Sequence, residues 1–287
     1  MKITIASGKG GTGKTTIAAS LSLSLTTMKP EQPPLFLDCD VEAPNAHLFL
    51  KPVFDQHQEV GILIPQVNEE VCTHCGKCAE VCQYHAIVLV GLKTLVFPQL
   101  CHGCGSCTWI CPERAITEVS DKIGQLERGP AQQGIQFGRG VMDVGEPMAV
   151  PVIRQLKKWI MPHFGQVVIV DAPPGTSCPV VESMRGADFV LLVTEPTPFG
   201  LHDLRLAVKV AYELNIPVGV VINRDGSGDA GVDEFCAREG LPVMMRVPFE
   251  RAIAEGVARG QTLLEIHPDY TERFRQVFAD IVERIRQ

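Results

Sequence analysis

A glycine-rich loop near the amino terminus constrains the fold of this chain more than any other feature. Residues 8–15 read Gly-Lys-Gly-Gly-Thr-Gly-Lys-Thr and fit the pattern G-x-x-x-x-G-K-S/T, in which backbone N–H groups cradle a phosphate at the start of a helix. A β-rich run at residues 2–6 precedes the loop and a helical pattern at residues 14–27 follows it, which is the context that the motif requires. The motif predicts that Lys14 reaches the β- and γ-phosphates of a nucleotide and that the Thr15 hydroxyl binds Mg²⁺.

Short apolar runs, each closing on a polar residue, recur through the rest of the chain. They cover residues 35–37, 167–170, 189–193, 218–222 and 242–247. Helical patterns separate several of them, as at residues 200–214. Near-continuous apolar strands are typical of a parallel sheet that is covered on both faces and carries its chemistry at the carboxyl ends of the strands. We therefore expect an α/β fold, a P-loop parallel sheet with helices on both faces.

One cysteine-dense stretch interrupts this alternation of strands and helices. Eight of the eleven cysteines lie between Cys72 and Cys111, in two copies of C-x2-C-x2-C-x3-C. This spacing resembles the bacterial ferredoxin run, in which the fourth cysteine of each copy binds the other of two [4Fe–4S] clusters. One predicted ligand set is therefore Cys72, Cys75, Cys78 and Cys111, and the other is Cys82, Cys101, Cys104 and Cys107. Zinc is the alternative metal for these cysteines. Zinc sites favour two C-x2-C pairs with a longer spacer, whereas here a third cysteine follows after two residues.

The cysteine-dense stretch also sets the expected domain boundaries. We expect a nucleotide-binding domain formed by residues 1–61 and 121–287, and a small inserted α+β ferredoxin-like domain at residues 62–120. The segment 124–145 is rich in glycine and is expected to be a loop-rich return into the main domain. Cys82 is followed by Gln83, whereas the ferredoxin pattern has proline there, as at Pro112 after Cys111. This departure bears on the geometry and potential of the second cluster.

Lys9, directly after the first glycine of the loop, makes the motif similar to the deviant Walker A motif of the MinD/ParA/nitrogenase iron protein family. The resemblance covers the whole α/β portion. In that family two subunits face each other over their nucleotides, and the extra lysine contacts the nucleotide of the partner subunit. The resemblance thus implies a homodimer that forms on ATP binding, with Lys9 among its catalytic residues.

Three further segments resemble that family. Residues 37–40 resemble switch I, which implies that Asp40 orients the attacking water and that Asp38 supports the Mg²⁺ site. Residues 170–175 resemble switch II, which implies that Asp171 holds Mg²⁺ through water and that Gly175 senses the γ-phosphate. Residues 222–224 resemble the strand end that contacts adenine in that family. The resemblance implies that Asn223 binds the base, with Arg224 beside it. The phosphate-binding residues are then expected to be Gly8, Gly10, Gly11, Thr12, Gly13, Lys14, Thr15 and Thr16.

The remaining cysteines and the carboxyl terminus have plainer interpretations. Cys39 and Cys236 are expected to be buried small hydrophobic residues. Cys178 occupies the place of a cluster ligand in the nitrogenase iron protein, but the second cysteine needed before residues 138–140 is absent. We therefore expect a structural role, with transient metal or cluster handling as the alternative. The C-x-x-C motif of the related Mrp-type cluster carriers is absent from the α/β part. The apolar stripe at residues 274–285 has nearly balanced charges and is expected to pack against the domain rather than bind a membrane.

Charge and targeting signals narrow the function classes. The formal net charge of −7 and the pI near 5.6 argue against a nucleic-acid-binding face. The first residues do not fit a signal peptide, and no apolar run is long enough for a membrane helix, so we expect a cytoplasmic protein. In a reducing compartment, eleven cysteines indicate metal or redox chemistry rather than disulfides.

The sequence favours an ATP-driven iron–sulfur protein with ATP, Mg²⁺ and two [4Fe–4S] clusters as cofactors. ATP binding would close a dimer and gate the delivery of electrons or clusters to a redox protein or metalloprotein partner. One alternative is a cluster carrier or metallocentre assembly factor. Another is a ParA-like positioning ATPase whose clusters are structural or sensory. Four cysteines for each cluster favour electron transfer over donation, because a donated cluster is usually held more loosely.

Overall fold

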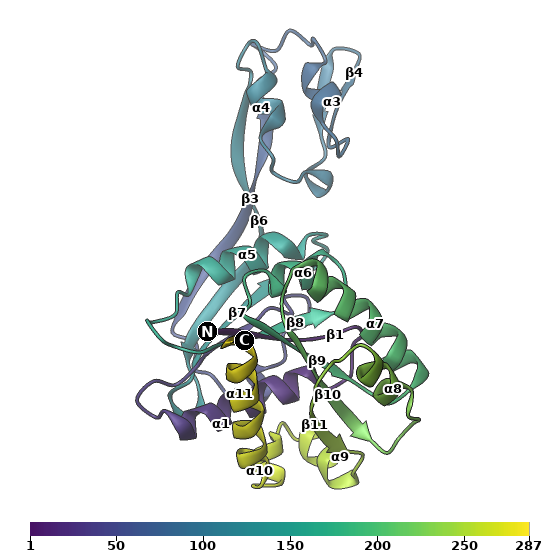
Figure 1. Cartoon of the computed structure of the whole chain (residues 1–287). Coiled ribbons are helices and arrows are strands. Elements are labelled where there is room, and N and C mark those ends of the chain that lie inside the picture. The colour runs from purple at the N-terminus through teal and green to yellow at the C-terminus, as the bar shows by residue number, and fades with distance from the viewer. Residues whose placement is uncertain (287) are drawn as a thin grey trace.

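The computed structural model describes residues 1–286 and consists of a broad α/β body from which a slender arm rises (Figure 1). A nine-stranded sheet of order β11-β10-β9-β1-β8-β2-β7-β6-β3 runs through the body. The strands from β11 to β7 pair in parallel, whereas β6 and β3 add antiparallel pairs at one edge. The parallel strands are β1 (Lys2–Ser7), β2 (Leu35–Asp38), β7 (Gln136–Met142), β8 (Val168–Pro174), β9 (Phe189–Thr194), β10 (Val218–Asp225) and β11 (Val243–Pro248).

Helices cover both faces of this sheet, which confirms the expected α/β class. On β9, Phe189 and Leu191 pack toward one face, and Val190 and Leu192 pack toward the other. Such strands bury side chains on both faces and therefore read as unbroken apolar runs. One face carries α1 (Lys14–Met28), α2 (His47–Leu50), α9 (Arg251–Ala258), α10 (Leu263–Ile266) and α11 (Tyr270–Arg286). The other carries α5 (Ala149–Trp159), α6 (Cys178–Met184), α7 (Pro198–Glu213) and α8 (Gly231–Arg238).

Helix α11 packs on α1 through the apolar stripe that the sequence predicts. Tyr270, Phe274, Val277 and Ile281 are buried in the core cluster that also contains the α1 side chains. The stripe is therefore used for packing inside the body. Within residues 1–286, no helix combines the length and the apolar character that crossing a lipid bilayer requires.

The expectation of a loop-rich return at residues 124–145 is wrong. Most of this segment belongs to two strands, β6 (Ile116–Pro130) and β7, joined through a short 3-10 turn η2 (Gln132–Gly134). Gly124, Gly129, Gly138 and Gly140 lie in the strands and allow close packing, whereas Gly134 and Gly145 have positive φ angles and serve turns. A Cβ atom on Gly140 would lie 2.7 Å from Cγ1 of Val41 and 2.8 Å from Cγ1 of Val152, so glycine lets α5 and the residues after β2 approach β7.

The arm grows out of the edge of the central sheet. Strand β3 (Gln56–Val67) pairs along its whole length with β6, and the two strands leave the body together as a ribbon (Figure 1). Within the body the ribbon is clamped in the core, since Val60 and Ile123 are buried, whereas Leu63 further out is 50% exposed. The arm then carries α3 (Lys77–Val81), the hairpin β4 (Ile87–Val90) and β5 (Lys93–Val96), the 3-10 turn η1 (Pro98–Leu100) and α4 (Ser106–Ile110).

The internal sequence repeat has a structural counterpart in the arm. Helices α3 and α4 occupy equivalent places in the two copies, and each follows a glycine with positive φ, 77° at Gly76 and 73° at Gly105. A side chain would strain the backbone at these positions. The two glycines thus let each chain segment turn sharply from its cysteine loop into a short helix.

Candidate functional site

The glycine-rich loop joins β1 to α1 and forms one end of a cavity of about 400 Å³. Gly11 and Gly13 have φ angles of 78° and 90°, and Gly13 is the residue before α1, which has no side-chain cap at its amino terminus. The first N–H groups of α1 are therefore free to bind an anion, at the positive end of the helix dipole. The side chains of Lys14, Thr15 and Thr16 are buried at this end of the helix.

Three aspartates meet beside the loop at the carboxyl ends of β2 and β8. Lys14 Nζ lies 3.3 Å from Oδ2 of Asp40. Asp38 and Asp171 are neighbours across the parallel pair of β2 and β8. The Asp38 carboxylate accepts hydrogen bonds from the backbone N–H groups of Asp40, at 3.2 Å, and Ala46, at 3.0 Å, so it shapes the turn that presents Asp40.

Asp171 is fully buried, and neither carboxylate oxygen has a hydrogen-bond partner among residues 1–286. Burial raises the pKa of Asp171 to about 6, although the Lys14 charge and the Thr15 hydroxyl oppose the rise. Burial and the adjacent Asp171 charge raise the pKa of Asp38 to about 8. An orphaned carboxylate next to a threonine hydroxyl provides the oxygen donors that Mg²⁺ prefers, so the residues present fit this ion.

Polar side chains from the ends of β9 and β10 hold the loop from its other side. Glu195 Oε2 lies 3.1 Å from Lys9 Nζ, and Glu195 Oε1 lies 2.6 Å from Arg224 Nη1. Arg224 also donates to the carbonyl of Gly11 at 3.3 Å, and Asn223 Nδ2 donates to the carbonyl of Thr12 at 2.7 Å. Lys9 is thus tied to its own chain through Glu195, a residue that the sequence reasoning missed although it directly follows an apolar strand.

The cavity extends from the loop to the connection between β11 and α9. Of the residues expected to bind nucleotide, seven line it: Gly11, Gly13, Lys14, Thr15, Thr16, Asn223 and Arg224. Its far wall, which the sequence reasoning also missed, contains Pro248, Phe249 and Glu250 together with Ile253 and Val257 of α9.

Four other expected residues lie beside the cavity rather than on its lining. Gly8 packs so tightly on the backbone of Asp203 that a Cβ atom would overlap it. A Cβ atom on Gly10 would lie 3.9 Å from Pro174, and Gly175 donates its N–H to the carbonyl of Ser7 at 3.0 Å. Thr12 is buried. These contacts join the loop to α7 through Gly8 and to the end of β8 through Gly10 and Gly175.

Two small hollows in the arm are each lined by four cysteines. One contains Cys72, Cys75, Cys78 and Cys111, and the other contains Cys82, Cys101, Cys104 and Cys107. These are the two sets that the ferredoxin spacing predicts, and ligation itself stays a prediction. In the described part of the chain, no three His, Cys, Asp or Glu side chains converge so that they could hold one metal ion. A cubane makes a different demand, because each thiolate binds its own iron at a separate corner.

Backbone groups around the hollows suit thiolate sulfur. Ala86 N–H donates to Cys82 Sγ and Ala115 N–H donates to Cys111 Sγ, both at 3.3 Å and at equivalent positions of the repeat. The Ser106 hydroxyl and N–H lower the pKa of Cys104, whereas burial raises the pKa of Cys78, Cys101 and Cys107. Donors aimed at sulfur stabilise its negative charge, so this donor set fits an iron–sulfur cluster.

The three other cysteines lie in the body. Cys39 and Cys236 are buried, as expected, and burial raises the pKa of their thiols to about 12 and about 11. Cys178 is exposed at the first residue of α6. Its expected structural role therefore does not include packing in the core.

Comparisons with known proteins agree with this geometry. Residues 3–263 match the model of one family, described as the CobQ/CobB/MinD/ParA nucleotide-binding domain. An uncharacterized protein of Methanocaldococcus jannaschii is 31% identical over 92% of this chain and 92% of its own length. The iron–sulfur cluster carrier protein of that organism is 23% identical over 99% of this chain and 84% of its own length. The fold is similar to the septum site-determining protein MinD of Pyrococcus horikoshii, complexed with Mg-ADP, with a TM-score of 0.57 and 19% identity over 98% of this chain and 95% of that chain.

Proposed function

This chain belongs to the CobQ/CobB/MinD/ParA family of nucleotide-binding proteins, and on that premise we propose that it is a Mg²⁺-dependent ATPase that gates electron delivery from two [4Fe–4S] clusters on its arm. The observation that carries the proposal is the presence, in one chain, of a phosphate-binding loop on a cavity and of two hollows with four cysteines each.

The residues around the loop suffice for phosphoryl transfer to water. Such catalysis depends on positioning and charge neutralisation and needs no covalent intermediate with the protein. Lys14 and the N–H groups at the start of α1 would bind the phosphates. Thr15, and Asp171 through water, would hold Mg²⁺, with Asp38 in support. Mg²⁺, when bound, neutralises charge on the phosphate oxygens. Asp40 orients the attacking water, and its contact with Lys14 keeps it beside the loop.

The far wall of the cavity suits a nucleobase. Ile253 and Val257 offer an apolar surface, and Asn223 and Arg224 lie where the cavity passes from the loop to this wall. A base pocket of this kind is largely apolar, with a few polar groups that fix orientation. We assign the adenine ring to this space, with Asn223 as its polar contact.

Dimerisation on ATP binding requires Lys9 to change partners. Its ion pair with Glu195 is one-third exposed on the lysine side, where solvent screens the charge, and buried on the glutamate side, where Arg224 also holds the carboxylate. The phosphate charge of a nucleotide held by a second subunit would compete with Glu195 for this lysine. Nucleotide binding and subunit pairing are thereby linked through one side chain.

The clusters are assigned to the arm by the two sets of four cysteines. Complete ligation by four thiolates favours a cluster that is retained, and a retained cluster serves electron transfer rather than donation. A second function, cluster carriage, is favoured by the similarity to an iron–sulfur cluster carrier protein over nearly the whole chain. The two candidates differ in whether the cluster leaves the protein.

Metal analysis of anaerobically purified protein tests the cluster assignment. We expect about eight iron and eight sulfide per chain. Cys78→Ser should remove one cluster and largely spare the other, because the hollow of Cys78 shares no cysteine with the second hollow. Stoichiometric zinc after reconstitution with iron and sulfide would contradict the assignment.

Incubation of the reduced protein and Mg-ATP with an oxidised holo-ferredoxin in one arm, and with an apo-ferredoxin in the other, separates the two functions. Electron delivery predicts that the protein keeps its iron while the holo-ferredoxin is reduced. Cluster carriage predicts that iron and sulfide move to the apo-ferredoxin in equal amounts and that the protein becomes depleted of both. The visible absorbance of the holo-ferredoxin reports reduction, and gel filtration followed by iron analysis of each protein reports transfer.

A further inference from the structure

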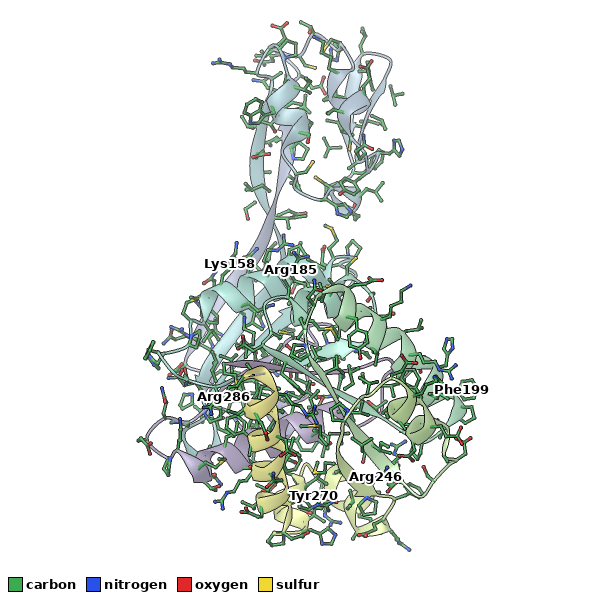
Figure 2. All side chains as sticks on the ribbon, in the orientation of Figure 1. Lys158, Arg185, Phe199, Arg246, Tyr270 and Arg286 are labelled. Carbon is green, nitrogen blue, oxygen red and sulfur yellow. The ribbon has the colours of Figure 1, made fainter. Side chains whose placement is uncertain are left out.

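Helix α5 touches both the segment that follows β8 and the root of the arm. It packs against α6 on one side and against β3, β6 and β7 on the other. In Figure 1 it lies just below the point where β3 and β6 leave the body. Figure 2 places Lys158 of α5 and Arg185, which follows α6, on the end of the body from which the arm rises. Helix α6 itself begins four residues after β8 ends at Pro174.

Two cationic side chains of α5 fasten it to α6. Lys157 Nζ donates to the carbonyls of Glu182, Ser183 and Arg185, at 2.5, 3.4 and 2.9 Å. These carbonyls belong to the end of α6, where helical partners are missing, so the lysine satisfies them. Arg154 Nη2 lies 3.2 Å from Oε2 of Glu182. A shift of α6 is therefore transmitted to α5.

Gln155, between these two residues, holds the root of the arm. Its Nε2 donates to the carbonyl of Gly61 at 3.0 Å. The register of β3 against β6 shifts between Val60 and Gly61, and a Cβ atom on Gly61 would lie 2.9 Å from the carbonyl oxygen of Asp121. A β-bulge locally weakens the ladder and bends the strand. The extra residue of the bulge is Ile123 of β6, which is buried in the core together with Val60. Ile62 is partly buried against the same core, whereas Leu63 beyond it is half exposed.

We propose that Gln155 is a positioning residue that sets the direction of the arm according to the nucleotide bound in the body. Rearrangement of residues 171–178 moves α6, the two cationic contacts carry the movement to α5, and Gln155 passes it to the bulge at Gly61. The inference rests on the proposed function, because it requires the segment after β8 to respond to the γ-phosphate. The six residue-to-residue steps from Gly61 to Val67 span about 20 Å, so a rotation of about 10° at the bulge moves the far end of β3 by about 3.5 Å.

Hydrogen exchange of the cluster-loaded protein tests the proposal. Exchange is compared with Mg-ADP and with Mg-AMPPNP, in peptides that cover residues 56–63, residues 118–124 and residues 171–185. The variant is Gln155→Glu, which keeps the length of the side chain and removes the amide donor. The matched control is Lys158→Gln, an exposed position on the same helix. In the wild type and the control we expect exchange at the arm root to change about five-fold between nucleotides, as one hydrogen bond can shift a local opening equilibrium.

In Gln155→Glu the nucleotide-dependent difference at the arm root should fall below about two-fold, while residues 171–185 still respond. A full response of the root in this variant would overturn the proposal, as would a wild-type root that ignores the nucleotide while residues 171–185 respond. If exchange in residues 171–185 of the wild type does not differ between Mg-ADP and Mg-AMPPNP, the proposed function is contradicted, and this inference fails with it. If Gln155→Glu does not fold, Gln155→Met removes the donor without adding charge, and the same outcomes apply.

Discussion

Asp171→Asn should stabilise the nucleotide-free protein at neutral pH while it abolishes the Mg²⁺-dependent part of nucleotide binding. The wild-type carboxylate is fully buried and unpartnered among residues 1–286, so its charge opposes folding until a cation arrives. Asparagine has nearly the same shape without the charge. Function and stability therefore make opposite demands on this position.

The size of the effect follows from the pKa of Asp171, which burial raises from 3.8 to about 6. Below pH 3.8 the carboxyl group is protonated in both the folded and the unfolded chain, and no penalty exists. As pH rises through about 6, the unfolded chain has already lost this proton and the folded chain must lose it at a cost that reaches about 3 kcal/mol. At about pH 5 only about half of this cost is present. The Asp171 charge also raises the pKa of Asp38. Removing that charge lowers this pKa and so further stabilises the folded variant at the higher pH.

Urea unfolding at two pH values measures this difference under anaerobic conditions without Mg²⁺ or nucleotide. The free energy of unfolding of Asp171→Asn, relative to wild type, should be larger at about pH 7.5 than at about pH 5 by about 1.4 kcal/mol. The constant cost of burying the amide cancels in this comparison. Asp55→Asn, at an exposed carboxylate, is the control and should show no such change. A relative stability that is independent of pH would refute the reasoning, and so would a variant that still binds ATP more tightly when Mg²⁺ is added.

Two further predictions concern the loop and its partners. Lys14→Ala should weaken ATP binding by at least about a hundredfold in calorimetry, whereas Asp40→Ala should bind ATP and lose turnover. Hydrolysis at the wild-type rate by Asp40→Ala would show that Asp40 does not orient the attacking water. Glu195→Gln should free Lys9 and lower the protein concentration needed for Mg-ATP-dependent dimerisation about two- to five-fold in sedimentation velocity, the range expected for an exposed ion pair. Loss of the dimer in that variant would mean that Glu195 is needed to present the lysine.

The sequence predicted the central strands and the loop well because each carries a local signal. The run at residues 35–37 became β2, which ends at Asp38, and the pattern at 14–27 became α1, which ends at Met28. Buried parallel strands read as apolar runs, and the glycine loop fixes which strand and helix it joins. The resemblance to the ferredoxin run implied the two groups of four cysteines, and the structure places each group around one hollow, while ligation stays a prediction.

Other features depend on which strands become neighbours, and no local pattern encodes that. The far wall of the cavity comes from the segment after β11. In the sheet, β9 and β10 lie between β11 and β1, and this strand order cannot be read from any local pattern. Glu195 was missed for the same reason, because its partners Lys9 and Arg224 belong to other strand ends. The segment 124–145 was misread because glycine is a turn signal in sequence, whereas the glycines within β6 and β7 permit close packing.

The continuity of the arm with the central sheet determines where movement can enter. A row of neighbouring residues crosses the sheet from the arm strand to the buried carboxylates: Glu127 of β6 lies opposite Arg139 of β7, Arg139 beside Asp38 of β2, and Asp38 beside Asp171 of β8. Glu127 and Arg139 also form an ion pair at 2.6 Å. Because backbone ladders connect every step, this part of β6 is held rigidly to the nucleotide site. In the proposal above, the arm turns near the bulge that Gln155 holds, and a nucleotide signal would reach the cysteines through the helices rather than through the sheet.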